Sequence, residues 1–438
     1  MKSFLGAYDG FFSGPPNSFL DYLVSFHSIP ITASLILALL LCIRGGLLFW
    51  SILMIILGIL VTAVFFTILP LPIIGPIGGH YHVGLVHLDG NRSQSLPPLA
   101  IFYPTNTPPQ KRGAPYVPFN DPIYLSGMAS YGKVPLYVMK DLLFVRLKVS
   151  PDAPPIPLND LKTPPPIIVF SHGLSGHYQF YGCLCADLAA RGAIVISIGH
   201  CDGSASFTRI VQGDKSEGND VPFKHLGWEV PVREAQLTQR VRELRHTLNR
   251  IKEMDFWKEI GYEELDIQKY LKEPLQLHLS GHSFGGATAL AAALQEEQVP
   301  GKKSVKSVIV FDPWHLPLQN EHFFQPIAEG KMRYTTPTYM VFSENWSKDK
   351  EIWDFFQRVT SAVLGQTFFA SFTEELKHSF FFTEKTPDTN HYFVSDLCVL
   401  SPVMHGKLNA VVPSRARIVE CSNTLIRVAK QYMDQTNS

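Results

Sequence analysis

Residues 281–286, GHSFGG, form the stretch that decides the fold of this 438-residue chain. An alternating, apolar-rich segment precedes it at residues 275–279, and an alanine-rich segment follows it at residues 287–294. This order predicts a strand, a tight turn and a helix, a context in which a serine hydroxyl projects above a parallel sheet as a nucleophile. Glycines suit the turn because a Cβ would collide where the helix doubles back on the strand. We therefore expect Ser283 to be a catalytic nucleophile.

Short apolar segments alternate with helical segments on both sides of this turn. Strands that are apolar on both faces and separated by helices indicate a parallel sheet covered on both sides, so the fold class is α/β. An antiparallel pair at residues 81–88 and 99–103 is expected to precede the parallel strands, because a polar turn around Asn91 joins them. The expected parallel strands are 167–170, 193–198, 275–279, 305–311 and 338–342, and the expected helices are 178–191, 232–254 and 286–297.

A serine nucleophile needs a base that removes its proton and a carboxylate that orients the base. In this type of fold the partners follow in the order serine, acid, histidine. Asp312 comes directly after the strand that follows the serine, and it is the expected acid. His378, His391 and His405 remain as candidates for the base. His391 follows a turn at residues 385–390 and is favoured, whereas His378 lies in a helix-like stretch and is the main alternative.

The negative oxygen of the tetrahedral intermediate requires two preorganised backbone N–H groups. One is expected from Phe284, the residue after the nucleophile. The other is expected from Leu174, in the glycine-containing loop SHGLSG at residues 171–176, which follows an early strand. Together with the acid and the base, these two amides complete the predicted catalytic site.

Other polar residues are not expected to take part in the chemistry. Asp202 precedes the serine in the chain, so it is expected to hold the turn that follows it, beneath the site. The charged residues of the helix at 232–254 are expected to form a solvated face: Arg233, Glu234, Arg240, Arg242 and Glu243. His80, His82 and His87 lack a carboxylate or cysteine that would complete a metal site. The six cysteines show no zinc-ligand spacing, and no metal or cofactor is expected.

The apolar residues are concentrated at the N-terminal end of the chain. Residues 47–69 form an uncharged apolar run of about 23 residues, long enough to span a bilayer, and residues 29–43 form a second run of about 15. Only RGG at residues 44–46 separates them. Two alternatives remain: a tight helical hairpin with the arginine at its turn, or one transmembrane helix preceded by an interfacial segment. The chain is predicted to consist of a membrane anchor, residues 1–75, and a catalytic domain, residues 76–438.

An integral membrane protein is therefore expected, with the membrane as its partner. If Arg44 stays on the cytoplasmic side, the catalytic domain lies on the lumenal or extracellular side. Glycosylation sequons that begin at Asn91 and Asn345 are consistent with that side. The 38 basic residues balance the 38 acidic ones, so the net charge gives no indication of a nucleic-acid partner.

Several segments together resemble the platelet-activating-factor acetylhydrolase family, the group VII phospholipase A2 branch of the α/β-hydrolases. They occur in the family's order and are VFSHGL at residues 169–174, GHCDGSA at 199–205, GHSFGG at 281–286, DPW at 312–314 and HYFVSD at 391–396. Two features depart from the family. Cys201 stands where the family usually has arginine, and the apolar N-terminal segment replaces a secretion signal or lipid anchor.

The resemblance implies an α/β-hydrolase fold and a role for each site residue. Ser283 would be the nucleophile, Asp312 the acid and His391 the base, with Leu174 and Phe284 as the oxyanion donors. It also implies calcium-independent hydrolysis of the acetyl, short or oxidised sn-2 acyl ester of glycerophospholipids such as platelet-activating factor, through an acyl-enzyme. The alternatives are a general carboxylesterase or lipase, and a catalytically silent hydrolase fold used as a membrane-tethered binding module.

Overall fold

The computed structural model describes most of the chain, in the ranges 29–43, 48–68, 73–91, 95–111, 113–161, 164–212, 215–299, 304–370, 381–387 and 389–396, with residues 373, 400, 423 and 426. Three residues that the sequence singles out, Arg44, His378 and His405, lie outside this part of the chain. The orientation that Arg44 implies and the alternative base His378 therefore stay predictions, as does the boundary between the two predicted domains at residue 75.

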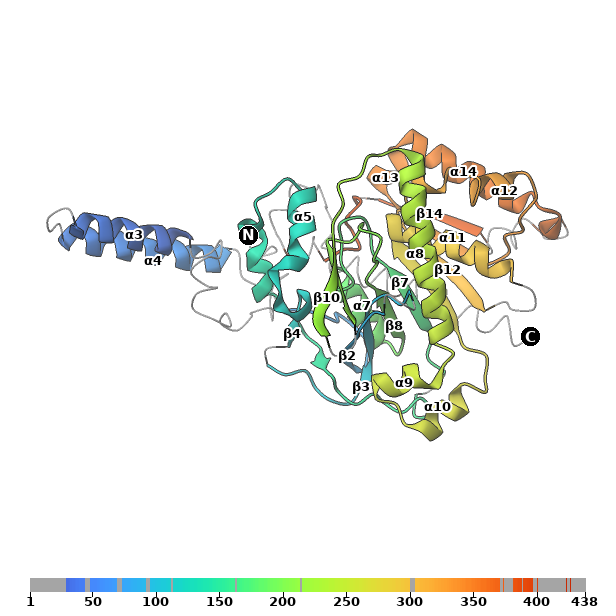
Figure 1. Cartoon of the computed structure of the whole chain (residues 1–438), viewed down its shortest axis with the longest axis horizontal. Helices are drawn as coiled ribbons and strands as arrows, with labels where there is room; N and C mark the ends of the chain where they lie inside the picture. Colours follow the sequence, from blue (N-terminus) through green and yellow to red (C-terminus); the bar gives the residue numbers. More distant parts are fainter. Residues whose placement is uncertain are drawn as a thin grey trace.

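A nine-stranded sheet forms the centre of the described chain (Figure 1). Its strands are β2 (His82–Leu88), β3 (Leu99–Thr105), β6 (Ser150–Pro151), β7 (Ile167–Ser171), β8 (Ile194–Ile198), β11 (Leu277–His282), β12 (Val305–Phe311), β13 (Thr338–Ser343) and β14 (Phe381–Thr386). Their order is β14-β13-β12-β11-β7-β8-β3-β2-β6. The strands from β14 to β8 pair in parallel, and β3 pairs antiparallel with both β8 and β2. The predicted parallel sheet and the antiparallel pair before it are confirmed.

Separate hydrophobic cores cover the two faces of the sheet. Along β7, Ile167 and Val169 belong to one core, and Ile168 and Phe170 belong to the other, as the two-residue period of a strand requires. The helices that complete these cores are α7 (Gly182–Ala190), α8 (Val230–Arg250), α11 (Phe284–Glu297) and α14 (Lys350–Leu364). Helices α8, α11 and α14 pack on the first face and α7 on the second. Burial on both sides explains why these strands are apolar throughout.

Shorter elements surround the sheet. They are the strands β1 (Ile73–Ile74), β4 (Ala114–Pro115), β5 (Arg146–Leu147), β9 (Phe207–Gln212) and β10 (Lys215–Pro222), the helices α5 (Ser126–Tyr131), α6 (Leu136–Met139), α9 (Met254–Ile260), α10 (Glu264–Tyr270), α12 (Phe324–Ala328) and α13 (Glu344–Lys348), and the 3₁₀ helices η2 (Pro118–Asn120), η3 (Pro122–Leu125), η4 (Lys140–Phe144), η5 (Leu316–Leu318) and η6 (Thr367–Phe369). The antiparallel pair of β9 and β10 was not predicted, because the polar sequence of β10 shows no strand pattern.

Two apolar helices, α3 (Ile29–Ile43) and α4 (Leu48–Ile68), lie side by side and project from the rest of the chain (Figure 1). Ser51 of α4 donates a hydrogen bond to the carbonyl oxygen of Ala38 at 3.2 Å, so the two helices run antiparallel in close contact. A Cβ on Gly58 would lie 2.4 Å from Ser34 Oγ, which shows how closely the backbones approach. Of the two arrangements expected at this end of the chain, the structure has the helical hairpin.

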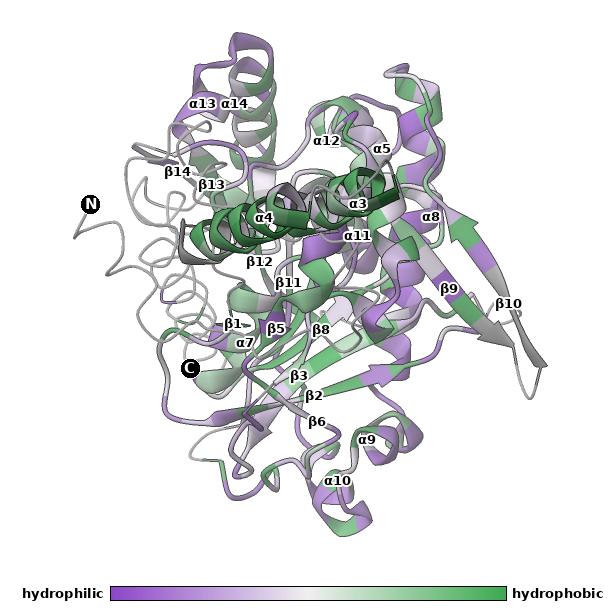
Figure 2. Ribbon diagram, turned by 90° about the vertical axis from the view of Figure 1, so that its left-hand side faces the viewer, coloured by the Kyte–Doolittle hydropathy of each residue, from purple (hydrophilic) through white to green (hydrophobic). Residues whose placement is uncertain are grey.

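The predicted transmembrane span is not supported. Within the described residues, no helix combines the length and the apolar character needed to cross a membrane. Helix α3 has 15 residues, fewer than the roughly 20 that a span requires. Helix α4 has 21 residues, but the side chains of its last turn lie outside the described part of the chain. The ribbons of both helices are nevertheless coloured as hydrophobic over most of their length (Figure 2).

We predict that Leu290→Ala will lower the free energy of unfolding by about 2–5 kcal/mol. Leu290 lies on α11 and is fully buried against the sheet, so its truncation leaves a cavity. Leu265 lies on α10 with 80 % of its surface exposed, and Leu265→Ala should change the same free energy by less than about 0.5 kcal/mol. Urea denaturation followed by circular dichroism measures both. A loss below about 1 kcal/mol for Leu290→Ala would contradict the described packing of α11.

Candidate active site

Ser283 occupies the sharp turn between β11 and α11. Its φ of 56° lies in the left-handed region, where a residue with a Cβ is strained. The glycines of the motif make this turn sterically possible. A Cβ on Gly285 would lie 1.8 Å from the carbonyl oxygen of Ser171, and a Cβ on Gly281 would lie 2.4 Å from the carbonyl carbon of Gly285. The strand–turn–helix predicted from GHSFGG is therefore present, with the serine at its apex.

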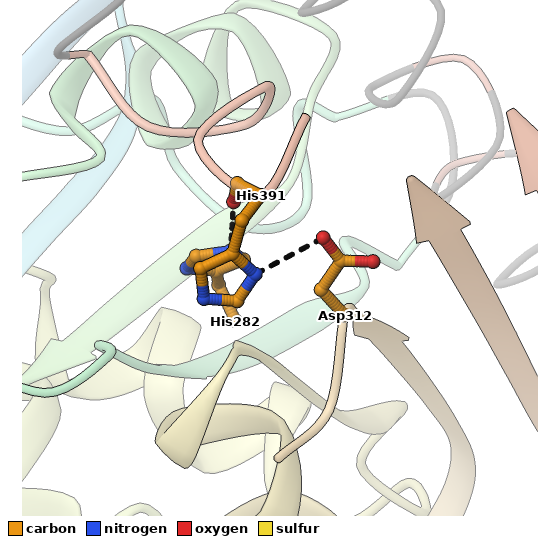
Figure 3. A group of neighbouring side chains, drawn as sticks. All are labelled: His282, Asp312 and His391. Carbon is orange, nitrogen blue, oxygen red and sulfur yellow. Dashed lines mark hydrogen bonds and ion pairs between the residues drawn. The ribbon is translucent and has the colours of Figure 1, made fainter. Parts of the chain in front are cut away.

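The structure brings Ser283, Asp312 and His391 together. Ser283 Oγ lies 3.0 Å from His391 Nε2, and His391 Nδ1 lies 3.1 Å from Asp312 Oδ2 (Figure 3 shows the second of these bonds). Asp312 follows the last residue of β12, and His391 comes from the loop after β14. Asp312 also accepts hydrogen bonds from the backbone N–H and the hydroxyl of Ser343, each at 2.6 Å. The carboxylate is thus held in place, with one oxygen directed at the imidazole.

Burial sets the protonation states of His391 and Asp312. It lowers the pKa of His391, so the imidazole is neutral at pH 7 and Nε2 can accept a proton from Ser283. Burial also raises the pKa of Asp312 to about 7, although the hydrogen bonds from Ser343 act in the opposite direction. Because the acid and the base share a hydrogen bond, their titration belongs to the pair. Above about pH 7 the pair therefore has a carboxylate facing a neutral imidazole.

Among the described residues, three further rings surround His391, and two of them lie within 4.5 Å of it, centroid to centroid. Trp346 stacks on it with 3.9 Å between ring centroids and an interplanar angle of 11°. The indole of Trp346 is fixed in turn by a hydrogen bond from Nε1 to the carbonyl oxygen of Pro313. His282 lies 4.5 Å from His391, centroid to centroid. The stacked indole limits rotation of the imidazole away from Ser283.

Of the two predicted oxyanion donors, Phe284 follows Ser283 directly in the chain, and the loop that contains Leu174 lies beside Ser283. Phe284 is the first residue of α11, where a backbone N–H has no partner within its own helix. Leu174 belongs to the loop after β7, and a Cβ on its neighbour Gly173 would lie 3.3 Å from Ser283 Cβ. No hydrogen-bond partner of the Leu174 amide is found among the described residues. Both amides are therefore available to a ligand.

A hydrogen-bonded chain that the sequence did not predict connects this loop to the histidine loop. The Gly173 N–H donates to Tyr181 Oη at 3.2 Å, and the Tyr181 hydroxyl donates to His282 Nδ1 at 2.8 Å. His282 Nε2 then donates to the carbonyl oxygen of His391 at 2.6 Å. His282 stands beside the nucleophile in the motif, but nothing in the sequence marks Tyr181 as its partner.

His282, Asp312 and His391 lie close enough together to suggest a cation site, with one ligand atom of each within 4.8 Å of the others. Both ring nitrogens of His282 are already used in hydrogen bonds, to Tyr181 and to the His391 carbonyl. The two ring nitrogens of His391 are also used, because Nε2 is hydrogen-bonded to Ser283 Oγ and Nδ1 to Asp312 Oδ2. The cluster is therefore better suited to proton transfer than to coordination of a metal.

The prediction of a solvated face on α8 is wrong for Arg233, Arg240 and Glu243, which are only 2 %, 0 % and 4 % exposed. Arg233 donates to the carbonyl oxygen of Leu226, whereas Arg240 and Glu243 contact the segment after β8. Arg240 Nε lies 3.3 Å from Asp202 Oδ2, and Glu243 Oε2 lies 2.7 Å from His200 Nδ1. Asp202 holds the turn that follows it, as predicted. A network of ionisable side chains thus lies buried against the loop that contains Leu174.

The sheet order and the position of Ser283 in the turn between β11 and α11 define a fold of the α/β-hydrolase class. A ferulic acid esterase from Streptomyces cinnamoneus has a similar fold, with a TM-score of 0.54 over 81 % of this chain and 91 % of that one. The two sequences are 17 % identical, so this likeness concerns the fold alone.

Residues 72–418 match the family described as platelet-activating factor acetylhydrolase, isoform II, and the chain belongs to that family. It is 29 % identical over 290 residues to a platelet-activating factor acetylhydrolase of Canis lupus familiaris, covering 63 % of this chain and 61 % of the dog protein. A platelet-activating factor acetylhydrolase of Bos taurus is 29 % identical over 200 residues, which cover 43 % of this chain and 42 % of the bovine protein. The matches thus span less than two thirds of these relatives. The family resemblance inferred from the sequence motifs is confirmed.

The rate at which a fluorophosphonate labels the wild-type chain should fall as the pH drops through about 7, the pKa to which burial raises Asp312. Below this pH the Asp312–His391 pair holds one more proton, and a pair in that state cannot take the proton of Ser283. The rate constant should decline by about tenfold per pH unit on the acid side. Stopped-time labelling between pH 5 and 9 measures it, with circular dichroism at each pH to verify the fold. A rate that is constant from pH 5.5 to 8 would contradict the assignment.

Proposed function

We propose that this chain is a calcium-independent serine esterase that hydrolyses the acetyl, short or oxidised sn-2 acyl ester of glycerophospholipids such as platelet-activating factor. The hydrogen-bonded line from Ser283 Oγ through His391 to Asp312 Oδ2 carries the proposal. It has the distances that a nucleophile, base and orienting acid require. Membership of the platelet-activating factor acetylhydrolase family supports the substrate class.

The reaction follows from the positions of these atoms. Ser283 Oγ attacks the ester carbonyl carbon while His391 Nε2 takes the hydroxyl proton, and Asp312 stabilises the imidazolium that forms. The carbonyl oxygen becomes an anion and accepts hydrogen bonds from the amides of Leu174 and Phe284. His391 then gives its proton to the lysophospholipid oxygen as the ester bond breaks. Water then attacks the acyl carbon while His391 takes its proton, the bond to Ser283 Oγ breaks as His391 returns that proton to Oγ, and the carboxylic acid is released.

We also propose that the α3–α4 hairpin contacts a lipid surface. Its outward side chains are large and apolar, and among them Leu39, Ile43 and Phe49 are 62 %, 72 % and 70 % exposed. Leaving this area in water is unfavourable, by roughly 25 cal/mol for each Å² of apolar surface. Insertion of the hairpin among acyl chains removes that area from water without requiring either helix to cross the bilayer. The lumenal or extracellular position of the catalytic domain stays part of the proposal, and Asn345, the first residue of one sequon, is exposed.

The acyl preference is tested with phosphatidylcholines that carry acetyl, oxidised short or palmitoyl chains at sn-2. For the full chain, kcat/KM should be at least about tenfold higher for the acetyl substrate than for the palmitoyl one, as the specificity of an acyl site is expressed in this ratio. Ser283→Ala should lose activity by at least about 10⁴-fold. Ser361→Ala, on the exposed side of α14, is the matched control and should keep the wild-type rate. Equal rates on acetyl and palmitoyl chains would favour a general carboxylesterase or lipase, and no hydrolysis or labelling would favour a silent fold.

Lipid contact is tested by flotation with neutral phosphatidylcholine vesicles. Leu39→Asp combined with Phe49→Asp should reduce vesicle binding by about tenfold or more, because each change places a charge on the surface that enters the lipid. Leu265→Asp, at a leucine that is 80 % exposed on α10, is the control and should bind as the wild type does. Hydrolysis of a water-soluble acetyl ester should stay unchanged in both variants. Unchanged flotation of the double variant would rule out the hairpin as the contact.

A further inference from the structure

We propose that Arg240 is a positioning residue that fixes both donors of the oxyanion site. The proposal rests on the proposed function, in which Leu174 and Phe284 donate to the anion. Arg240 lies on α8, away from Ser283 in the sequence, and its side chain is fully buried. Its guanidinium contacts the segment of each donor, and these contacts distinguish it from a residue that only fills space.

On one side, Arg240 holds the loop that contains Leu174. Its Nη1 donates to the carbonyl oxygen of His172 at 2.8 Å. The same peptide unit ends in the N–H of Gly173, which donates to Tyr181 Oη at 3.2 Å. A peptide unit is planar, so bonds at both of its ends fix its orientation. The next N–H along the chain is that of Leu174, and its direction depends on this fixed unit.

The same guanidinium holds the far end of the loop. Arg240 Nε donates to Ser204 Oγ at 2.8 Å, and the carbonyl oxygen of Ser204 accepts the N–H of Ser175 at 2.7 Å. Asp202 Oδ2, at 3.3 Å from Arg240 Nε, supplies the balancing charge. Residues on both sides of Leu174 are thus tied, directly or through Ser204, to one buried group.

On its other side, Arg240 packs on the second donor. Its Cζ lies 4.3 Å from the centroid of the Phe284 ring, a distance at which a cation is attracted to the face of an aromatic ring. Phe284 is the first residue of α11, so a fixed ring also fixes the start of the helix that carries its amide. The planar guanidinium combines directed hydrogen bonds with stacking, and a lysine cannot reproduce this combination.

Burial of a charge costs free energy that an apolar side chain of similar size would not cost. A role in stability alone therefore explains Arg240 poorly. A role in the reaction explains its contacts better, because Arg240 contacts His172, in the loop that contains Leu174, and the ring of Phe284. If Arg240 positions the two amides, its loss should weaken binding of the anionic tetrahedral intermediate. Binding of the uncharged substrate should stay largely unchanged.

The test compares Arg240→Met, Arg240→Lys and Arg245→Met in the full chain. Arg245 is the matched control, because it lies on the same helix and pairs with Glu296 at 2.6 Å, away from the site. Arg240→Met should lower kcat for a soluble acetyl ester by roughly 10- to 100-fold, somewhat less than the loss of a whole oxyanion donor, with KM changed less than about threefold. Arg240→Lys should recover part of kcat, and Arg245→Met should keep kcat within about twofold.

The decisive measurement is the affinity of a trifluoromethyl ketone, which forms a tetrahedral anion on the serine. In folded Arg240→Met, verified by its thermal transition, this affinity should fall by the same factor as kcat. An unchanged affinity per folded molecule would overturn the proposal and leave Arg240 with a structural role. If Arg240→Met does not fold, Arg240→Lys decides in the same way. If Ser283→Ala retains activity, the proposed function itself fails, which is a separate result.

Discussion

The close approach of the turn at Ser283 to the end of β7 is the constraint on which the site depends. No atom can be added to Gly285, because the carbonyl oxygen of Ser171 already occupies the position where a Cβ would lie. This contact places the start of α11 directly against the loop that contains Leu174. Ser283 and the loop that contains Leu174 therefore lie together because two parallel strands, β7 and β11, are neighbours in the sheet. The strained φ of Ser283 is the local cost of that arrangement.

Most of the fold could be predicted from the sequence, because its signals are periodic. The apolar strands, the alanine-rich helix and the glycine-containing turn GHSFGG can each be recognised from a few neighbouring residues. Asp312 could be placed because it directly follows a strand, and His391 because a turn precedes it. These inferences need only chain order and the rule that parallel strands end at the same edge.

The contacts beneath the site could not be predicted in this way. Arg240 and Glu243 occupy positions on α8 that suit a solvated helix equally well, and only the packing of α8 against the segment after β8 buries them. Tyr181 meets His282 across 101 residues of sequence. The apolar N-terminal runs predicted helices correctly, but not whether those helices cross a membrane. The burial of these side chains and their contacts depend on residues that are distant in the sequence, and a local sequence pattern does not identify those residues.

His391, the proposed base, lies in the loop after β14, and this position has a consequence for synthesis of the protein. Strand β14 lies at the edge of the sheet, and His391 follows it, more than a hundred residues after Ser283. A ribosome delivers the chain from its N-terminus, so the serine, the acid and the oxyanion loop emerge first. A nascent chain that has not yet reached residue 391 contains Ser283 without its proposed proton acceptor. The proposed activity therefore requires that residue 391 has been made and that β14 has paired with β13.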